Sequence, residues 1–207
     1  MYRRTVAEDV SVGTSLLRVQ ATDDDEGVNG IVRYFIDSGD PAYDFALDMA
    51  SGVLRLQKQL DYERVTRYNL VVRAEDSGVE RVLNSTANIT LTITDVNDFQ
   101  PIFDDSPYVA YVQEEMADGP VEVITVTARD EDNFTNSRVA YYFRDINQEI
   151  NGVFTIDELS GRISTTNMKL DREQTPMYVL TIIATDSGKF KCYTIVGIFS
   201  SWPTLFL

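Results

Sequence analysis

The chain has 207 residues, of which 33 are acidic, 18 are basic and none is histidine, giving a formal net charge of −15. This charge disfavours nucleic acids and anionic membrane surfaces as partners, because phosphate contacts need clustered lysine and arginine. The absence of histidine removes the commonest general base and a frequent zinc ligand. Hydrophobic residues make up 43% of the chain, which is enough for a buried core.

From the N-terminus onward, apolar and polar residues alternate, which is typical of half-buried β-strands. The predicted inward positions in the first half begin with Leu17, Val19 and Ala21, and turn residues such as Ser51-Gly52 separate the runs. About seven short strands per hundred residues predict an all-β fold of Greek-key β-sandwiches. Cys192 is the only cysteine, so no disulfide can form within the chain.

The pattern occurs twice, at an offset of about 108 residues, which is the size of one small domain. Leu60-Asp61-Tyr62-Glu63 matches Leu170-Asp171-Arg172-Glu173, and other motifs follow at similar offsets. We therefore predict two tandem seven-stranded domains, residues 1–98 and 99–207. The first is expected to lack the start of its first strand. The second is expected to diverge and to be truncated after residue 188, where the repeat pattern is lost.

Between the two copies lies Asp95-Val96-Asn97-Asp98, followed by Phe99 and, after one more residue, by Pro101. Carboxylate and amide oxygens at this density suit a hard cation such as Ca²⁺, which takes six to eight oxygen ligands. The sequence therefore predicts a calcium-binding linker between two repeats.

Three other interpretations of the acidic residues compete with a linker site. A solvated acidic surface explains a lone aspartate in a turn, but not clusters that recur at matched positions. An EF-hand loop starting at Asp23 would need glutamate where Tyr34 stands. A hydrolase would use Asp61 and Glu63 as paired carboxylates, yet the pair returns at Asp171 and Glu173, and duplicated binding sites are commoner than duplicated catalysis.

The ordered set Glu8, Asp61-Tyr62-Glu63, Asp95-Val96-Asn97-Asp98, Asp130-Glu131-Asp132 and Asp186 resembles the extracellular cadherin repeat, in the style of the long nonclustered cadherins of the Fat, Dachsous or cadherin-23 type. The resemblance covers residues 2–188 and implies about three Ca²⁺ ions between the repeats. The implied ligands are Glu8, Asp61, Glu63, Asp95, Val96, Asn97, Asp98, Phe99, Asp130, Asp132, Asn136 and Asp186. Incomplete outer half-sites would comprise Asp23, Asp25, Asn29, Asp76, Glu114, Asp171 and Glu173.

The resemblance implies a calcium-dependent cell–cell adhesion module on the extracellular side of the plasma membrane, and not an enzyme. Its implied partners are other cadherin ectodomains, homophilic or heterophilic, with no nucleic acid and no small-molecule substrate. The membrane would be reached only through parts of a longer parent chain. The alternatives are a rigid spacer without partner contact and, more remotely, a carboxylate hydrolase. Sequons at Asn84, Asn88 and Asn133 are compatible with an extracellular glycoprotein.

Overall fold

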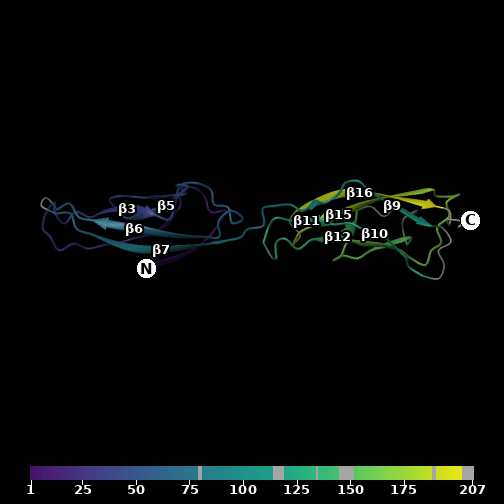
Figure 1. Cartoon of the computed structure of the whole chain (residues 1–207), viewed down its shortest axis with the longest axis horizontal. Coiled ribbons are helices and arrows are strands. Elements are labelled where there is room, and N and C mark those ends of the chain that lie inside the picture. Colours follow the sequence, from purple (N-terminus) through teal and green to yellow (C-terminus); the bar gives the residue numbers. More distant parts are fainter. Residues whose placement is uncertain (79–80, 114–118, 134, 145–151, 188–189, 202–207) are drawn as a thin grey trace, which may run out of the picture. The chain divides into compact units, whose positions relative to one another are not determined.

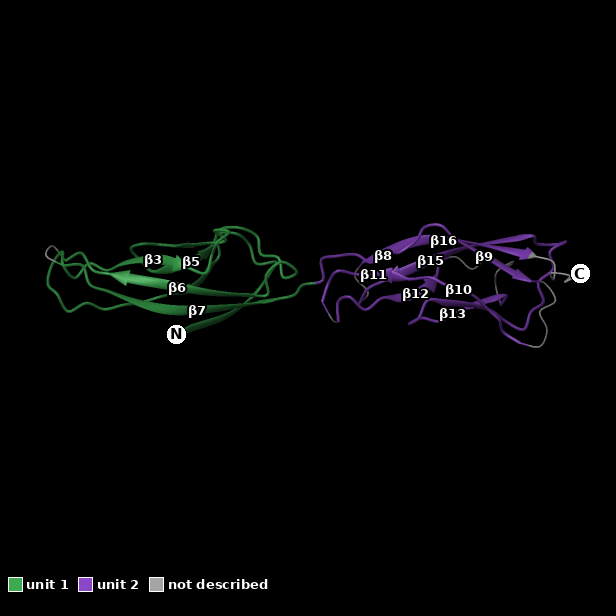
Figure 2. Ribbon diagram, in the orientation of Figure 1, with its two compact units in different colours: residues 1–96 green, residues 97–207 purple. Residues whose placement is uncertain are grey.

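The computed structural model describes residues 1–78, 81–113, 119–133, 135–144, 152–187 and 190–201. Within these ranges the regular structure consists of β-strands, and no helix is long and apolar enough to cross a membrane. The chain divides into two compact units, Met1–Val96 and Asn97–Leu207 (Figure 2). The predicted boundary after residue 98 lies two residues beyond this division.

Unit 1 is a sandwich of two β-sheets with strand orders β1-β7-β6-β3 and β2-β5-β4 (Figure 1). Strand β1 runs parallel to β7, whereas the other paired strands of the unit are antiparallel. The strands are β1 (Tyr2–Ala7), β2 (Ser15–Arg18), β3 (Arg33–Ser38), β4 (Phe45–Leu47), β5 (Val53–Leu56), β6 (Arg67–Glu75) and β7 (Asn84–Thr94).

Unit 2 repeats this topology with sheets β9-β16-β15-β12 and β10-β14-β13, and adds the short pair β8 and β11. Strand β9 runs parallel to β16, as β1 does to β7. The strands are β8 (Ile102–Phe103), β9 (Tyr108–Gln113), β10 (Glu122–Thr125), β11 (Ala128–Arg129), β12 (Ala140–Phe143), β13 (Phe154–Ile156), β14 (Arg162–Thr165), β15 (Met177–Thr185) and β16 (Lys191–Ser201). The predicted all-β fold of tandem sandwiches is confirmed.

Each unit has its own hydrophobic core between its two sheets. In unit 1 the core residues include Leu54 on β5 and Ile89 on β7, both fully buried. In unit 2 they include Ile163 on β14 and Ile198 on β16, also fully buried. Burial of alternate apolar side chains from both sheets is what stabilises each sandwich.

A β-bulge in β2 adds one buried residue, Leu16, that the alternation did not predict. The register of β2 against β5 shifts between Ser15 and Leu17. As a result Leu16 is the buried residue at 7% exposure, whereas Leu17 is only partly buried at the edge of the core. A bulge places an extra residue in one strand, so strict alternation cannot locate the inward side chain there.

The expectation that the second repeat lacks a proper last strand is wrong for the described backbone. Strand β16 pairs with β15 from Lys191 to Phe199, and with β9 from Val196 to Ser201. Its inward residues Val196 and Ile198 are fully buried. The remaining tail from Trp202 onward lies outside the described residues.

Two repeated turns require glycine. Gly52 and Gly161 have φ angles of +67° and +69°, a region that favours glycine. A Cβ atom at Gly161 would lie 2.2 Å from the carbonyl oxygen of Val126, and one at Gly52 would lie 2.4 Å from that of Val19. The recurrence of Ser-Gly at matched positions therefore has a steric cause.

Candidate metal centre

In unit 1, three predicted ligands lie together. Carboxylate oxygens of Glu8, Glu63 and Asp95 are all within 4.8 Å of one another. Glu8 follows β1 and Asp95 follows β7, and these strands are parallel neighbours, so their C-terminal ends meet at one edge of the sheet. The strand pairing is thus what brings together two residues that are far apart in the sequence.

Glu8 is the buried member of this group, with 2% of its surface exposed. The Val96 N–H donates to its Oε1 at 2.7 Å, and the Tyr62 N–H donates to its Oε2. Backbone donors of this kind stabilise a buried carboxylate charge. They also tie both the first linker residues and the 61–63 turn to the end of β1.

Asp61 has a different local role. Its Oδ1 accepts the Arg64 N–H at 2.7 Å, which closes the turn that precedes β6. Asp171 does the same for Gln174 at 3.0 Å in unit 2. Asp61 does not belong to the group of three carboxylates, and its part in metal binding remains a prediction.

In unit 2, a second group consists of Asp130, Asp132 and Asp186, again with carboxylate oxygens within 4.8 Å of one another. Asp132 and Asp186 are buried, at 5% and 3% exposure. The Asp132 N–H donates to Asp130 Oδ1 at 2.9 Å. Asp132 Oδ1 accepts from the backbone N–H groups of Asp98 at 3.3 Å and Phe99 at 3.4 Å. The linker backbone is therefore held against this acidic group.

The second group concentrates negative charge in a poorly solvated place. Burial raises the pKa of Asp130, and the charges of Asp132 and Asp186 raise it further. The Oδ2 atoms of Asp130 and Asp132 are buried and have no hydrogen-bond partner among the described residues. Buried carboxylate oxygens without a donor are unfavourable by themselves, and a cation satisfies them. The residues present therefore fit a metal ion.

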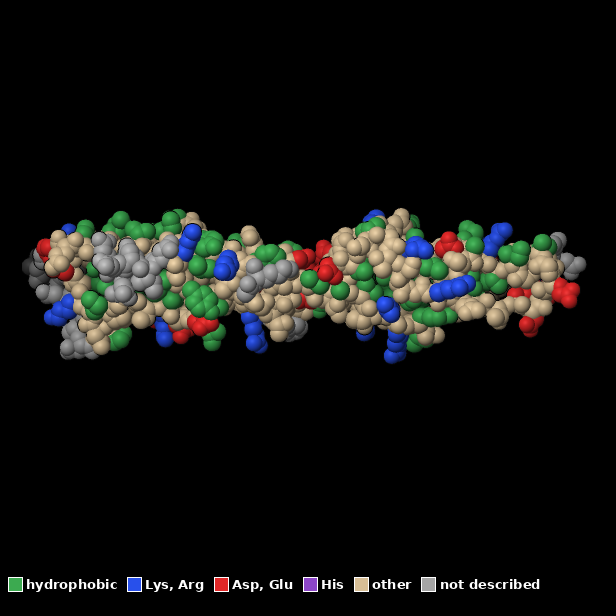
Figure 3. Space-filling view, turned by 180° about the vertical axis from the view of Figure 1, so that it is seen from behind, with side chains coloured by type: hydrophobic (Ala, Val, Ile, Leu, Met, Phe, Trp, Pro, Cys, Tyr) green, Lys and Arg blue, Asp and Glu red, His purple; other side chains and the backbone are tan. Residues whose placement is uncertain are grey.

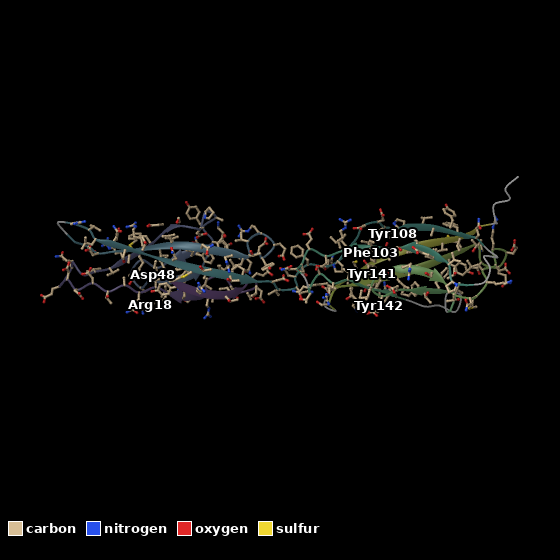
Figure 4. The ribbon with its side chains drawn as sticks, turned by 60° about the horizontal axis from the view of Figure 1, so that its bottom comes forward. Arg18, Asp48, Phe103, Tyr108, Tyr141 and Tyr142 are labelled. Atoms are coloured by element: carbon tan, nitrogen blue, oxygen red, sulfur yellow. The ribbon has the colours of Figure 1, made fainter. Side chains whose placement is uncertain are left out.

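Tyrosines that were not predicted as functional position the acidic loop of unit 2. The Tyr141 hydroxyl accepts the Ala128 N–H at 2.8 Å, and the Tyr108 hydroxyl donates to the Thr127 carbonyl at 3.0 Å. The ring of Phe103 lies against both tyrosine rings, with centroids 6.3 Å apart (Figure 4). These contacts fix the chain just before Asp130.

Unit 1 uses the same device, since the Tyr34 hydroxyl accepts the Ala21 N–H at 2.9 Å just before Asp23. Tyr34 and Tyr141 recur at the repeat offset. That recurrence is the signal in the sequence from which this role could have been predicted.

The outer half-site of unit 1 is only partly assembled. The Asp25 N–H donates to Asp23 Oδ1 at 2.8 Å, as Asp132 does to Asp130. Asp76 is buried and accepts the Gly78 and Leu83 N–H groups at 3.2 and 2.9 Å. However, the three aspartates do not form a three-carboxylate group within the described part of the chain. Asp25 is exposed, unlike its counterpart Asp132.

The remaining predicted residues are placed as follows. The Asn97 side chain donates to Ser187 Oγ at 3.1 Å, and the Asn136 N–H donates to the Asn133 carbonyl at 3.0 Å. The Oδ1 atom of Asn29 is buried without a hydrogen-bond partner among the described residues. Glu173 is exposed, and Glu114 lies outside the described residues.

Comparisons with known proteins agree with this geometry. A family model described as the cadherin domain matches residues 2–94 and 108–198. Human protocadherin Fat 4 is 37% identical over 188 residues, which is 91% of this chain and 4% of that protein. The mouse cadherin EGF LAG seven-pass G-type receptor 2 is 38% identical over 187 residues, which is 90% of this chain and 6% of that protein. The chain thus spans a small part of these relatives.

Among solved structures, the crystal structure of mouse cadherin-23 EC22-24 matches with a TM-score of 0.87 and 32% identity, covering 97% of this chain and 63% of that chain. A structure of mouse clustered PcdhgC3 EC1-3 matches with a TM-score of 0.85 and 28% identity, covering 97% and 65% respectively. The two matched segments cover most of the two β-sandwiches, and the linker motif Asp95–Asp98 lies between them. The chain therefore belongs to the cadherin family and contains two tandem cadherin domains.

Proposed function

We propose that this chain is a calcium-dependent cell–cell adhesion module, in which Ca²⁺ stiffens the joint between two cadherin domains. The observation that carries the proposal is the pair of three-carboxylate groups, one in each unit, both in contact with the linker segment. Cadherins bind Ca²⁺ where successive repeats meet, and the acidic groups of this chain supply the matching ligand chemistry.

The donor set favours calcium over other metals. Its side-chain atoms are carboxylate and amide oxygens, and the chain has no histidine. Ca²⁺ accepts six to eight oxygens in flexible geometry, whereas Mg²⁺ demands near-octahedral coordination. The buried Oδ2 atoms of Asp130 and Asp132 are available to such an ion.

The proposed ligands are those implied by the sequence. Unit 1 would provide Glu8, Asp61, Glu63 and Asp95, and unit 2 would provide Asp130, Asp132, Asn136 and Asp186. The linker would add Asn97 and Asp98, with backbone oxygens of Val96 and Phe99. We propose about three ions, as in the family.

The physical consequence of metal binding would be mechanical. Without cations, clustered carboxylates repel one another; with Ca²⁺ they become shared ligands. Extracellular calcium modules bind at about 10⁻⁴–10⁻³ M, which matches permanent loading outside cells. We therefore place the chain on the extracellular side of the plasma membrane, with other cadherin ectodomains as partners and with no enzymatic activity.

Small-angle X-ray scattering tests the stiffening directly. In millimolar Ca²⁺ the wild-type chain is expected to show a narrow distribution of maximum dimensions, which broadens in chelator. Glu63→Gln is expected to broaden the distribution even in Ca²⁺, while both units still unfold cooperatively.

Glu131→Gln is the matched control, because it removes the same charge next to Asp132 without touching a proposed ligand. Glu131 is exposed and lies outside both three-carboxylate groups. Identical profiles for wild type and Glu63→Gln in Ca²⁺ would mean that Glu63 is a solvated surface acid and would contradict the proposal.

A further inference from the structure

The outward face of the β12-β15-β16-β9 sheet of unit 2 is apolar. Inward residues of these strands, such as Ala110, Leu180 and Val196, are buried, so their neighbours in sequence point to solvent. These neighbours include large hydrophobic side chains with exposed fractions of 45–71%: Val109, Tyr111, Met177, Val179, Tyr193 and Ile195. We call this surface the outer face of unit 2.

Tyr142 extends the outer face onto β12, because it is 40% exposed while its neighbour Tyr141 is buried (Figure 4). Tyr111 is stacked on Phe199 with ring centroids 5.5 Å apart, so aromatic groups continue across β9 and β16. The face is therefore one contiguous surface spread over four paired strands.

The equivalent face of unit 1 shows that the fold does not require this composition. Tyr2 pairs with Ile89 as Tyr108 pairs with Val196, and this register fixes the equivalent positions. Thr5 then corresponds to Tyr111, and Asn69 to Val179. The outward positions of β1, β6 and β7 carry mainly polar and basic residues: Arg3, Thr5, Arg67, Asn69, Asn88, Thr90 and Thr92.

Hydrophobic side chains reach the surface of both units (Figure 3), so exposure alone does not single out a patch. The total exposed area of the outer face is what distinguishes it. The exposed fractions of the six residues above and Tyr142 correspond to about three and a half fully exposed side chains. At roughly 200 Å² for a large side chain such as tyrosine, and less for valine, the outer face offers up to about 700 Å² of mainly apolar surface. A stable protein–protein interface needs about 800 Å² per partner, whereas the largest patch on a monomer is typically about 300–600 Å².

Charge also distinguishes the outer face. The four strands that build it contain no aspartate or glutamate, in a chain whose net charge is −15. Arg144 adds a positive charge, since its guanidinium lies 4.8 Å from the centroid of the Tyr193 ring. A carboxylate, Glu158, lies at the rim, where its Oε1 accepts a hydrogen bond from the Tyr142 hydroxyl. Away from that rim, two copies of the four strands can meet without opposing carboxylates.

Gly197 makes a recess in the middle of the face. It pairs with Val179 on one side and Val109 on the other. A Cβ atom there would meet only ordinary contacts, 3.7 Å from the Phe199 ring and 4.0 Å from the Tyr108 carbonyl oxygen, so packing within the unit does not demand glycine. Glycine inside a strand weakens it and often marks the close approach of another chain.

We propose that the outer face of unit 2 binds the outer face of a second copy of this chain, forming a two-fold symmetric dimer. An apolar face of this size, built on strands without aspartate or glutamate, is complementary to itself, as a two-fold interface requires. This inference rests on the adhesive function proposed above, because that function is the reason for expecting a cadherin ectodomain as the partner. None of the face residues is a proposed calcium ligand.

Sedimentation equilibrium of the purified chain in Ca²⁺ is the test. The average mass is expected to rise from 23.4 kDa towards twice that value as the concentration increases. Interfaces of this size have dissociation constants of roughly micromolar or lower. Val179→Lys and Tyr111→Lys are each expected to weaken dimerisation at least about tenfold, because a symmetric dimer would bury two opposed charges.

Asn69→Lys and Thr5→Lys are the matched controls, since they place the same charge at the equivalent positions of unit 1. They are expected to leave the dimer unchanged, and thermal unfolding checks that each variant is folded. A chain that stays monomeric at concentrations far above the micromolar range, or open-ended aggregation without a dimer plateau, would overturn the proposal. A dimer weakened equally by the unit 1 controls would do so as well.

The calcium proposal fails separately from this one. Loss of calcium binding with an intact dimer would contradict the proposed stiffening alone. Normal calcium binding by a strictly monomeric chain would contradict only the homotypic face, and would favour a rigid spacer.

Discussion

The packing of β16 into unit 2 predicts a large loss of stability for Ile198→Ala. Ile198 is fully buried in the core of unit 2 and pairs with Tyr178 and Ala110. Truncating a buried isoleucine to alanine costs about 2–5 kcal/mol, because it removes apolar contacts and leaves a cavity. For a unit of this size, a loss of about 3 kcal/mol lowers the melting temperature by roughly 12–24 °C.

Differential scanning calorimetry in Ca²⁺ measures this shift, because each unit has its own core and is expected to unfold in its own transition. Ile102→Ala is the matched control in the same unit: Ile102 on β8 is 63% exposed and lies outside the outer face, so its change should stay within about 1 kcal/mol. If Ile198→Ala and Ile102→Ala have equal, small effects, residues 191–201 do not complete the sandwich and the strand assignment is refuted.

Three further predictions follow from the polar contacts and turns. Burial raises the pKa of Asp130, so ionising this carboxyl costs more in the folded than in the unfolded state, and the calcium-free unit 2 should lose stability as pH rises above about 3.8 through that raised pKa. Asp130→Asn should remove this contribution. Melting temperatures of the two proteins that depend on pH with the same slope from pH 4 to 8 would contradict the prediction. Tyr68→Phe should cost about 1–3 kcal/mol by urea unfolding, since the Tyr68 hydroxyl donates at 2.8 Å to the buried Asp44; a neutral result would show that the hydrogen bond is dispensable. Gly161→Ala should destabilise unit 2 by more than about 1 kcal/mol, because its φ is +69° and the new Cβ would approach the Val126 carbonyl; unchanged melting would mean that the turn can relax.

The repeat and its acidic motifs could be predicted because they depend on local sequence. Motifs such as Asp-Tyr-Glu at 61–63 and Asp-Glu-Asp at 130–132 keep their spacing whatever the surrounding packing. Alternation of apolar residues predicted most strands for the same reason, since side chains on a strand alternate between its two faces. The meeting of Glu8 with Asp95 required the additional knowledge that their strands are parallel neighbours.

The features that were missed depend on tertiary context. The bulge in β2 buries Leu16 while Leu17 still packs against the core, and alternation contains no signal for a bulge. The last strand was missed because its outward residues Tyr193 and Ile195 are apolar while its buried residues include Thr194 and Ser200, which hides the period of two. Of its inward residues, Val196 and Ile198 match Ile89 and Leu91 of the first repeat.

Isothermal titration calorimetry of the intact chain with Ca²⁺ tests the central claim most directly. The account predicts about three ions per chain with dissociation constants of about 10⁻⁴–10⁻³ M and much weaker Mg²⁺ binding. Asp132→Asn should abolish part of this binding, because Asp132 is a buried member of the unit 2 group and holds the linker backbone. Tight Zn²⁺ binding without a response to Ca²⁺, or Ca²⁺ binding that Asp132→Asn leaves unchanged, would contradict the account.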